Sequence, residues 1–200
     1  MKYLERIQTI LPLGYLYLIL LGLLKESIQF YQLGINILSF SSITDILISP
    51  ISDLSKYPIL LFSVAAILIV LFSLQALLIR NSSKSWAQKI LGENRFNPES
   101  TSKEIQKITL PLVALAFGFV LLSFFVGLGI GKGASTARMI SKGDYTYNYK
   151  INFSSGKSLD AYVFASNSAY FFYVTKGNKN VSIIPVAVIG SLEIINNKHL

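Results

Sequence analysis

Three long apolar blocks without a charged side chain constrain this sequence most, and they span residues 7–24, 59–79 and 108–130. As α-helices the first two would extend for about 27 and 31 Å, close to the ~30 Å thickness of a bilayer's hydrocarbon core. The rest of the chain is too short and too polar to cover three helices that are apolar on every side. The sequence therefore predicts an integral membrane protein with three transmembrane helices.

The first block resembles a secretory signal peptide, because Lys2 and Arg6 precede it. A cleavage site needs small residues in an Ala-x-Ala-like arrangement, and the block ends instead in Leu23-Leu24-Lys25-Glu26. Two further apolar blocks follow it. We therefore expect it to stay in the protein as a signal anchor.

The distribution of Lys and Arg predicts the orientation of the chain in the membrane. Six basic residues lie in the loop of residues 80–107, against Lys25 and Lys56 in the loop of residues 25–57. Basic loops stay preferentially in the cytoplasm, so we expect loop 80–107 and the N-terminus inside and the C-terminal region outside a bacterial inner membrane. Four basic residues soon after the third block oppose this orientation: Lys132, Arg138, Lys142 and Lys150.

Two segments between the blocks are candidates for membrane-interface elements. Residues 28–50 are too apolar for an ordinary loop, and we expect an interfacial or re-entrant segment with a short extended stretch, then a capping box at Ser42 and helical turns that Pro50 ends. An interfacial lid is favoured there over a pore mouth. Loop 80–107 predicts a short basic amphipathic helix on an anionic leaflet, carried by Trp86, Ile90, Lys84 and Lys89.

The third block is rich in small residues at a spacing of four, which allows helix backbones to approach closely. Two stripes are candidates for helix packing or for oligomerisation, and the sequence leaves those alternatives open: Ala114 with Gly118, and Ser123 with Gly127 and Gly131. Gly127, Gly129, Gly131 and Gly133 do not fit a phosphate-binding loop, because the required first glycine is replaced by Val126. In the second block, Gln75 is expected to hydrogen-bond to another helix.

The chain is predicted to divide into a membrane region, residues 1–131, and a small β domain, residues 132–200. Apolar residues alternate with polar ones from Tyr145, and four further short strands follow, with a helical turn near 186–189 before the last. The predicted fold is an α+β membrane protein whose β domain is an SH3- or Sm-like barrel or a five-stranded meander. The candidate core residues of this domain are Tyr145, Tyr147, Tyr149, Ile151 and Phe153.

Several function classes are disfavoured by residue content. The chain has no Cys and one His, so thiolate sites, His-rich metal sites and Ser-His catalysis have little support. The acids after residue 131 are Asp144, Asp160 and Glu193, at no spacing that marks a carboxylate pair or metal site, and we expect no enzyme, cofactor or metal. Lysines among aromatic residues could bind nucleic acid, but core packing explains the aromatic residues better.

The sequence favours a non-enzymatic membrane protein whose β domain binds, senses or assembles, as one component of a multi-gene envelope-stress or defence system. Its expected partners are the lipid bilayer, further copies of the chain, or a protein bound by the β domain or the cytoplasmic loop. The alternative is a homo-oligomeric pore that the β domain gates.

Overall fold

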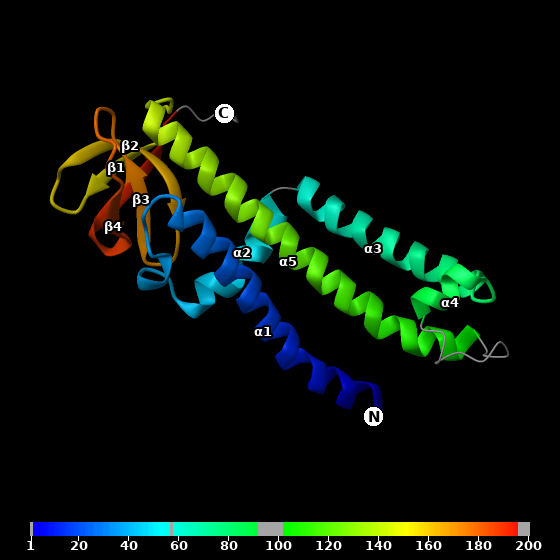
Figure 1. Cartoon of the computed structure of the whole chain (residues 1–200). Helices are drawn as coiled ribbons and strands as arrows, with labels where there is room; N and C mark the ends of the chain where they lie inside the picture. The colour runs from blue at the N-terminus through cyan, green and yellow to red at the C-terminus, as the bar shows by residue number, and fades with distance from the viewer. Residues whose placement is uncertain (1, 57, 92–101, 196–200) are drawn as a thin grey trace. The chain divides into compact units, whose positions relative to one another are not determined.

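The computed structural model describes residues 2–56, 58–91 and 102–195, and it has an α+β architecture (Figure 1). The elements in chain order are α1 (Lys2–Tyr31), η1 (Ile37–Ser39), α2 (Ile43–Lys56), α3 (Pro58–Arg80), α4 (Ser85–Leu91), α5 (Ser102–Lys142), β1 (Tyr149–Phe153), β2 (Ser158–Ser166), β3 (Tyr170–Val174), β4 (Ser182–Pro185), η2 (Val186–Val188) and β5 (Ile189–Ile194).

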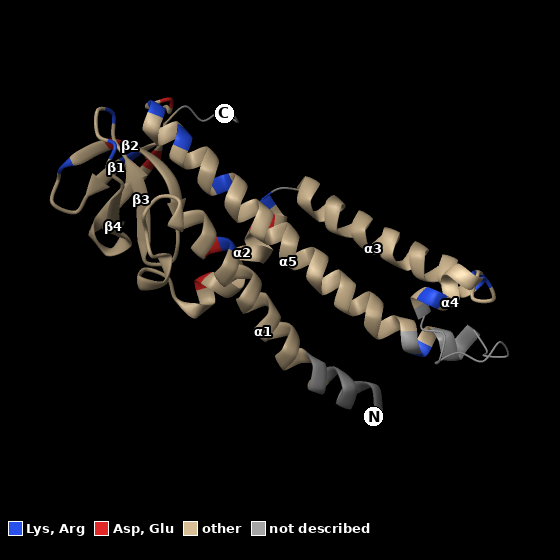
Figure 2. Cartoon of the chain, in the orientation of Figure 1, with Lys and Arg blue, Asp and Glu red and all other residues tan. Residues whose placement is uncertain are grey.

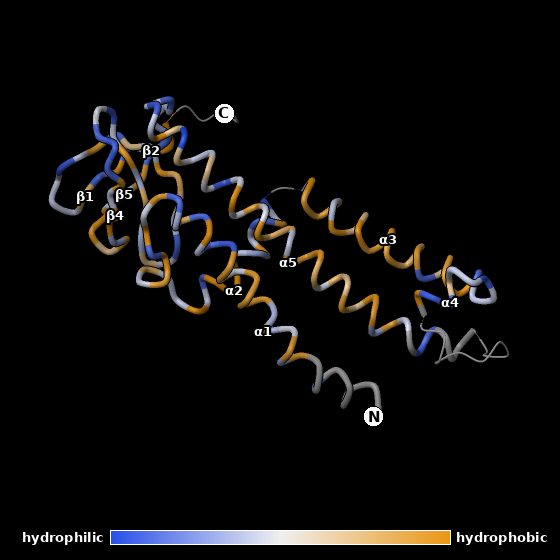
Figure 3. The backbone as a smooth tube through the Cα atoms, viewed as in Figure 1, coloured by the Kyte–Doolittle hydropathy of each residue, from blue (hydrophilic) through white to orange (hydrophobic). Residues whose placement is uncertain are grey.

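Three helices are long and apolar enough to cross a membrane, which confirms the prediction of a membrane protein. The candidate spans are Leu11–Tyr31 in α1, Pro58–Arg80 in α3 and Thr109–Lys142 in α5. Figure 3 shows the long hydrophobic stretches along these helices, and Figure 2 shows that their charged residues gather towards the ends.

Two membrane helices continue beyond the ends that the sequence predicted. The first was expected to end at Leu24 and the third at Ile130, but α1 runs to Tyr31 and α5 to Lys142. The polar residues that follow Leu24 and Ile130 suggested that each helix ends there, but in the structure these residues continue the helix. Both helices end in Schellman motifs with a glycine of positive φ, Gly34 and Gly143, in which hydrogen bonds from the following turn satisfy the last carbonyl groups.

Segment 28–50 also differs from its prediction. The expected extended stretch is instead a turn followed by η1, and the helix that begins after Ser42 passes through Pro50 to Lys56. The predicted capping box is confirmed: the amide of Asp45 donates to Ser42 Oγ (3.1 Å) and the amide of Ser42 to Asp45 Oδ2 (3.0 Å).

The C-terminal region is a five-stranded antiparallel sheet with strand order β4-β3-β2-β1-β5. The predicted helical turn before the last strand is present as η2. The predicted barrel is not confirmed, because β4 and β5 lie at opposite edges and the sheet is not closed. It is not a simple five-stranded meander either, since β5 returns to pair with β1. Pro185 ends β4 without a backbone N–H to donate.

The first strand begins four residues later than the alternation from Tyr145 predicted. The side chain of Asn148 replaces a backbone pair there: its Nδ2 donates to the carbonyl of Val163 (2.8 Å) and its Oδ1 accepts from the amide of Val163 (2.8 Å). Residues 145–147 instead lead towards the end of β3, where the hydroxyl of Tyr145 donates to the carbonyl of Thr175 (2.8 Å).

The chain forms two compact units, which we describe separately. The first unit comprises Met1–Ile51 and Phe125–Leu200, and therefore contains α1, most of α2, the second half of α5 and the sheet. The second unit comprises Ser52–Phe124, with α3, α4 and the first half of α5.

Candidate functional site at the helix ends and the sheet

Glycines bring α1 and α5 into close contact in the first unit. A Cβ at Gly129 would lie 2.6 Å from the carbonyl oxygen of Lys25, and one at Gly133 would lie 2.6 Å from the carbonyl oxygen of Gln29. Both distances are shorter than real Cβ contacts, so only glycine fits this crossing. The side chain of Gln32 adds a hydrogen bond from its Nε2 to the carbonyl oxygen of Ile130 (3.1 Å).

A third glycine joins α2 to α1. A Cβ at Gly22 would overlap the carbonyl oxygen of Ile46. That carbonyl is the one that Pro50, four residues later, cannot satisfy because proline has no N–H. Pro50 is fully buried and Ile46 is buried as well. The proline inside α2 is therefore accommodated where its freed carbonyl lies against a glycine of α1.

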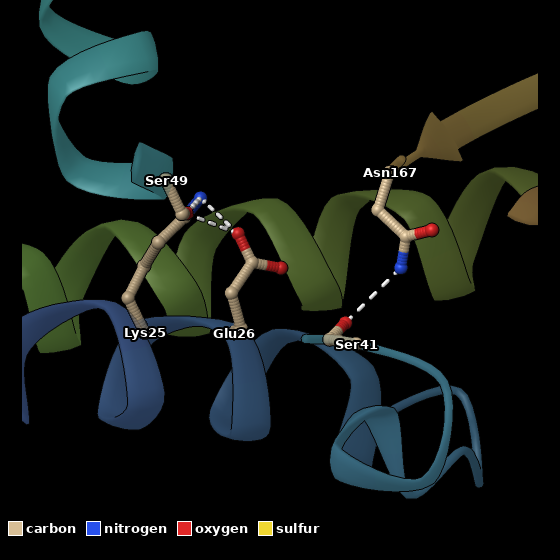
Figure 4. Close-up of polar contacts among 5 residues, drawn as sticks. All are labelled: Lys25, Glu26, Ser41, Ser49 and Asn167. Atoms are coloured by element: carbon tan, nitrogen blue, oxygen red, sulfur yellow. Dashed lines mark hydrogen bonds and ion pairs between the residues drawn. The ribbon is translucent and has the colours of Figure 1, made fainter. Parts of the chain in front are cut away.

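Lys25 and Glu26 of α1 form a buried polar cluster with Ser49 of α2 (Figure 4). Lys25 Nζ donates to Glu26 Oε1 (2.7 Å) and to Ser49 Oγ (2.9 Å), and Ser49 Oγ donates to the same carboxylate oxygen. The side chains of Lys25 and Glu26 are only 5% and 18% exposed. An ion pair this buried is costly to break on one side, because the remaining charge loses its partner.

The cluster lies where both helices leave their apolar stretches. Lys25 follows the uncharged block of α1, and its backbone contacts Gly129, one residue before the uncharged block of α5 ends. Ionisable side chains near a bilayer are found where they are paired or covered by protein. At this level the side chains of the two helices change from uncharged to ionisable, within the candidate spans Leu11–Tyr31 and Thr109–Lys142.

The ends of α1 and the sheet share an aromatic core. Phe30, Ile37 and Phe172 are each no more than 2% exposed, and the rings of Phe30 and Phe172 meet edge to face with centroids 4.9 Å apart. Phe40 contributes a second edge-to-face contact, with Tyr170 at 5.4 Å. One face of β3 therefore packs against α1 and the segment that follows it.

The other face of β3 is covered as well. Phe171 and Tyr173 pack against a second cluster, centred on Ile151, Ala161 and Val163 of β1 and β2. All five residues of β3 are apolar or aromatic, and this unbroken run is the sequence signal for a strand that packs on both faces; Phe172 and Val174 are buried, and Phe171 and Tyr173 are half-buried.

Hydrogen bonds tie the β2–β3 turn to the chain between α1 and α2. Asn167 Nδ2 donates to the carbonyl of Phe40 (2.8 Å) and to Ser41 Oγ (3.1 Å), the latter drawn in Figure 4. Ser168 donates to Asp45 twice, from its amide to Oδ1 (3.1 Å) and from its hydroxyl to Oδ2 (2.9 Å).

These contacts determine the pKa of Asp45. Partial burial by itself raises the pKa of this carboxyl, but hydrogen bonds from Ser42 and Ser168 to the charged form outweigh burial and hold the pKa below its ordinary value. Asp45 therefore serves two structures at once, as the acidic partner of Ser42 in the capping box of α2 and as the acceptor for the β2–β3 turn.

The end of α5 forms a third contact with the sheet. Ile140, Tyr145 and Val174 make a buried cluster, and the ring of Tyr145 stacks on Tyr162 with centroids 5.4 Å apart. Burial raises the pKa of the Tyr162 hydroxyl. The sheet is thus held by the ends of both α1 and α5.

The candidate small-residue stripe lies on a different face of α5 from the contact with α1. Gly127 and Gly131 have no atom within 4 Å of an added Cβ, while Gly129 and Gly133 make the contact with α1. Ser123 is exposed, and its hydroxyl donates to the carbonyl of Phe119 within its own helix. The four glycines form two pairs at a spacing of four, and spacing alone could not show which pair would meet α1.

The other candidate residues are dispersed. Ala114 and Gly118 lie in the second-unit half of α5, exposed and half-buried respectively, and the four residues around Trp86 lie in and beside α4. Of the five core candidates of the β domain, Tyr145 and Ile151 are buried, while the remaining three are half-buried: Tyr147, Tyr149 and Phe153.

In the second unit, the hydrogen bond predicted for Gln75 is confirmed. Its Nε2 donates to Thr109 Oγ1 at 2.9 Å, which joins α3 to α5, and the two side chains are 5% and 3% exposed.

The described residues contain no group of three or more His, Cys, Asp or Glu that could hold a metal ion. No protein-family model, curated protein or solved structure matches the chain.

Proposed function

We propose that this chain is a non-enzymatic membrane protein whose β domain binds a partner and passes that event to the membrane helices. The observation that supports the proposal is that β3 makes packing contacts on both faces, and that one of these faces packs on the end of α1. A domain attached only to carry a binding surface needs no such contact. In this chain, a displacement of β3 would also move Phe30 and therefore α1, because Phe30 packs against Phe172 of β3.

The proposed binding surface is the end of the sheet formed by η2 and β5. The exposed large hydrophobic side chains of the described β domain are Val186, Val188 and Ile194, all in or beside these elements. The outer edge of β5 is also unpaired among the described residues. An open edge with exposed apolar residues is suited to a bound protein segment.

The test is site-specific photo-cross-linking in the full chain in its native membrane. A photoreactive amino acid at Ile194 should give discrete protein adducts, while one at Phe119, which is 71% exposed on α5, should give none. The full chain is required, because an isolated β domain would lose Phe30 and Ile37 and would therefore expose Phe172. Equal labelling at both positions, or no adduct at Ile194, would reject the proposed surface.

A coupling test uses the tie between the sheet and the segment after α1. Asn167→Ala removes the two hydrogen bonds to Phe40 and Ser41, and also the two that its Oδ1 accepts from the amides of Ala169 and Tyr170 within the β2–β3 turn. The β5 edge lies on the other side of the sheet and keeps its residues. The proposal requires that Ile194 still cross-links in this variant while the response of the system falls. A full response in the variant would contradict transmission through this contact.

The homo-oligomeric pore is a second candidate, favoured by one observation. Among the described residues, no atom lies within 4 Å of a Cβ added at Gly127 or Gly131, so this face is open to a helix of another copy. Gly127→Leu and Gly131→Leu should then abolish chemical cross-linking between copies in mild detergent. Cross-linking that is unchanged in both variants would exclude this face as the interface.

We place the protein in a bacterial inner membrane with its N-terminus in the cytoplasm, as one component of a multi-gene envelope-stress or defence system. The basic loop between α3 and α5 supports this orientation. Reporter fusions after residues 91 and 200 test it, and a cytoplasmic signal at residue 200 would overturn it.

A further inference from the structure

Helix α4 presents an apolar outer face within the second unit. Trp86 and Ile90, one helical turn apart, are 46% and 63% exposed, while Ala87 between them is fully buried. A short helix with a buried small residue is held against its unit. The side chains of Trp86 and Ile90 nevertheless keep large parts of their apolar surface exposed.

Basic residues flank this face. Arg80 ends α3, Lys84 immediately precedes α4 and Lys89 lies in its last turn, and all three are exposed. From Pro58 to Leu91 the sequence contains no acidic residue. The charge of this region is therefore uncompensated along 34 residues of chain, which favours an anionic ligand.

The position of α4 along the chain sets its depth. Helix α3 rises by about 34 Å, enough to cross the hydrocarbon layer, and α4 begins five residues after its last residue. A tryptophan at that level places its ring among headgroups and its apolar part towards the acyl chains. Lysines beside it can extend their ammonium groups to lipid phosphates.

We propose that α4 is an interfacial helix that binds anionic lipid headgroups through Lys84 and Lys89, with Trp86 and Ile90 inserted at the acyl boundary. A lipid surface fits this face of α4 because the basic side chains complement anionic headgroups, and because α4 follows directly after the α3 span. Each basic residue close to an anionic membrane surface strengthens the attraction by a factor of about five. The inference is independent of the β domain and of the function proposed for it.

The chain provides its own probe, because Trp86 is its one tryptophan. The full protein is reconstituted in mixed bilayers of phosphatidylcholine and phosphatidylglycerol, with brominated acyl chains on only one of the two lipids. Bromine quenches tryptophan fluorescence on contact. Quenching should be stronger when phosphatidylglycerol carries the bromine, and added salt should reduce the difference.

Substitutions identify the source of the preference. Lys84→Gln with Lys89→Gln should abolish the difference between the two brominated lipids while quenching by both persists. The matched control is Lys176→Gln with Lys179→Gln in the β3–β4 loop, which also removes two exposed charges and should leave the preference unchanged.

Three results would overturn the proposal. Equal quenching by either brominated lipid in the wild type would exclude headgroup selectivity. A preference that survives in the Lys84 and Lys89 variant would place the selectivity elsewhere. Absence of quenching by both lipids would show that Trp86 does not contact acyl chains, and would make a protein the occupant of this face.

Discussion

Helix α5 belongs to both units, and its two halves are buried in different ways. In the first unit a stripe of Phe125, Gly129, Gly133 and Ile140 is buried. From Thr109 to Phe124, in the second unit, Thr109 is the one buried residue, and apolar side chains such as Leu115 and Phe119 are more than 70% exposed.

The difference follows from the partners that each half of the helix meets. Lipid tails are as apolar as leucine, so apolar side chains gain little from burial in a membrane, and helix association there depends on small residues and hydrogen bonds. The hydrogen bond Gln75–Thr109, which joins α3 to α5, is a contact of this kind. In the first unit the end of α5 meets the sheet, where Ile140 is buried in an apolar cluster.

The largest effect that separates the two regions is expected for phenylalanine. Phe172→Ala removes a fully buried ring between β3 and α1, and should lower the free energy of unfolding by about 3–5 kcal/mol. Phe119→Ala, on the exposed part of α5, should change it by less than about 0.5 kcal/mol. Unfolding in mixed detergent micelles, followed by circular dichroism, measures both. Similar losses would contradict the contrast between the units.

Alanine at the glycines of α5 should change sign with position. Gly129→Ala places a Cβ against the backbone of α1 and should destabilise by about 1–3 kcal/mol. Gly127→Ala meets nothing and should be neutral or stabilise by up to about 1 kcal/mol, because alanine is the better helix former. Thermal unfolding of the two variants in one detergent decides the matter. A loss at Gly127 as large as that at Gly129 would show that its face is also packed.

The polar contact of the second unit should be weaker. Gln75→Leu, Thr109→Val and the double variant form a cycle, whose coupling free energy should be about 0.6 kcal/mol, the average for hydrogen bonds between membrane helices. A coupling near zero would mean that the pair does not join α3 to α5, and one above about 2 kcal/mol would make it a principal contact of this unit.

The smallest effect should be at Asp45, and it depends on pH. The pKa of its carboxyl is depressed in the folded chain, so its contribution is present above pH 3.8, the ordinary value, and is lost as pH falls through the lower folded value. Asp45→Asn should remove this part of the acid dependence and lower stability at neutral pH. Stability measured against pH in both proteins tests this; superimposable acid limbs would contradict it.

The sequence was sufficient to predict features that depend on a local pattern of residues. The three spans follow from uncharged length, the capping box at Ser42 from its spacing to Asp45, and most strands from alternation or apolar runs. These signals are local, and the segments that carry them need no knowledge of their neighbours.

Features that depend on a distant partner were missed. The polar residues from Lys25 to Gln32 read as the end of a helix, because the sequence cannot show that α2 and α5 cover them. Three other features were missed because they also depend on distant contacts. These are which pair of glycines in α5 meets α1, the continuation of α2 through Pro50 beside Gly22, and the open sheet. In each, a contact from far along the chain overrides the local signal.

The contact between the sheet and the segment after α1 also has a consequence for biogenesis. Asn167 and Phe40 are separated by 127 residues, so the N-terminal partner is synthesised long before the strand that covers it. During translation the aromatic end of α1 therefore remains bare until β3 has left the ribosome, and packing of the sheet against α1 follows only then. Nascent chains that stop before β3 would display Phe30 and Phe40 to chaperones and to membrane quality-control proteases.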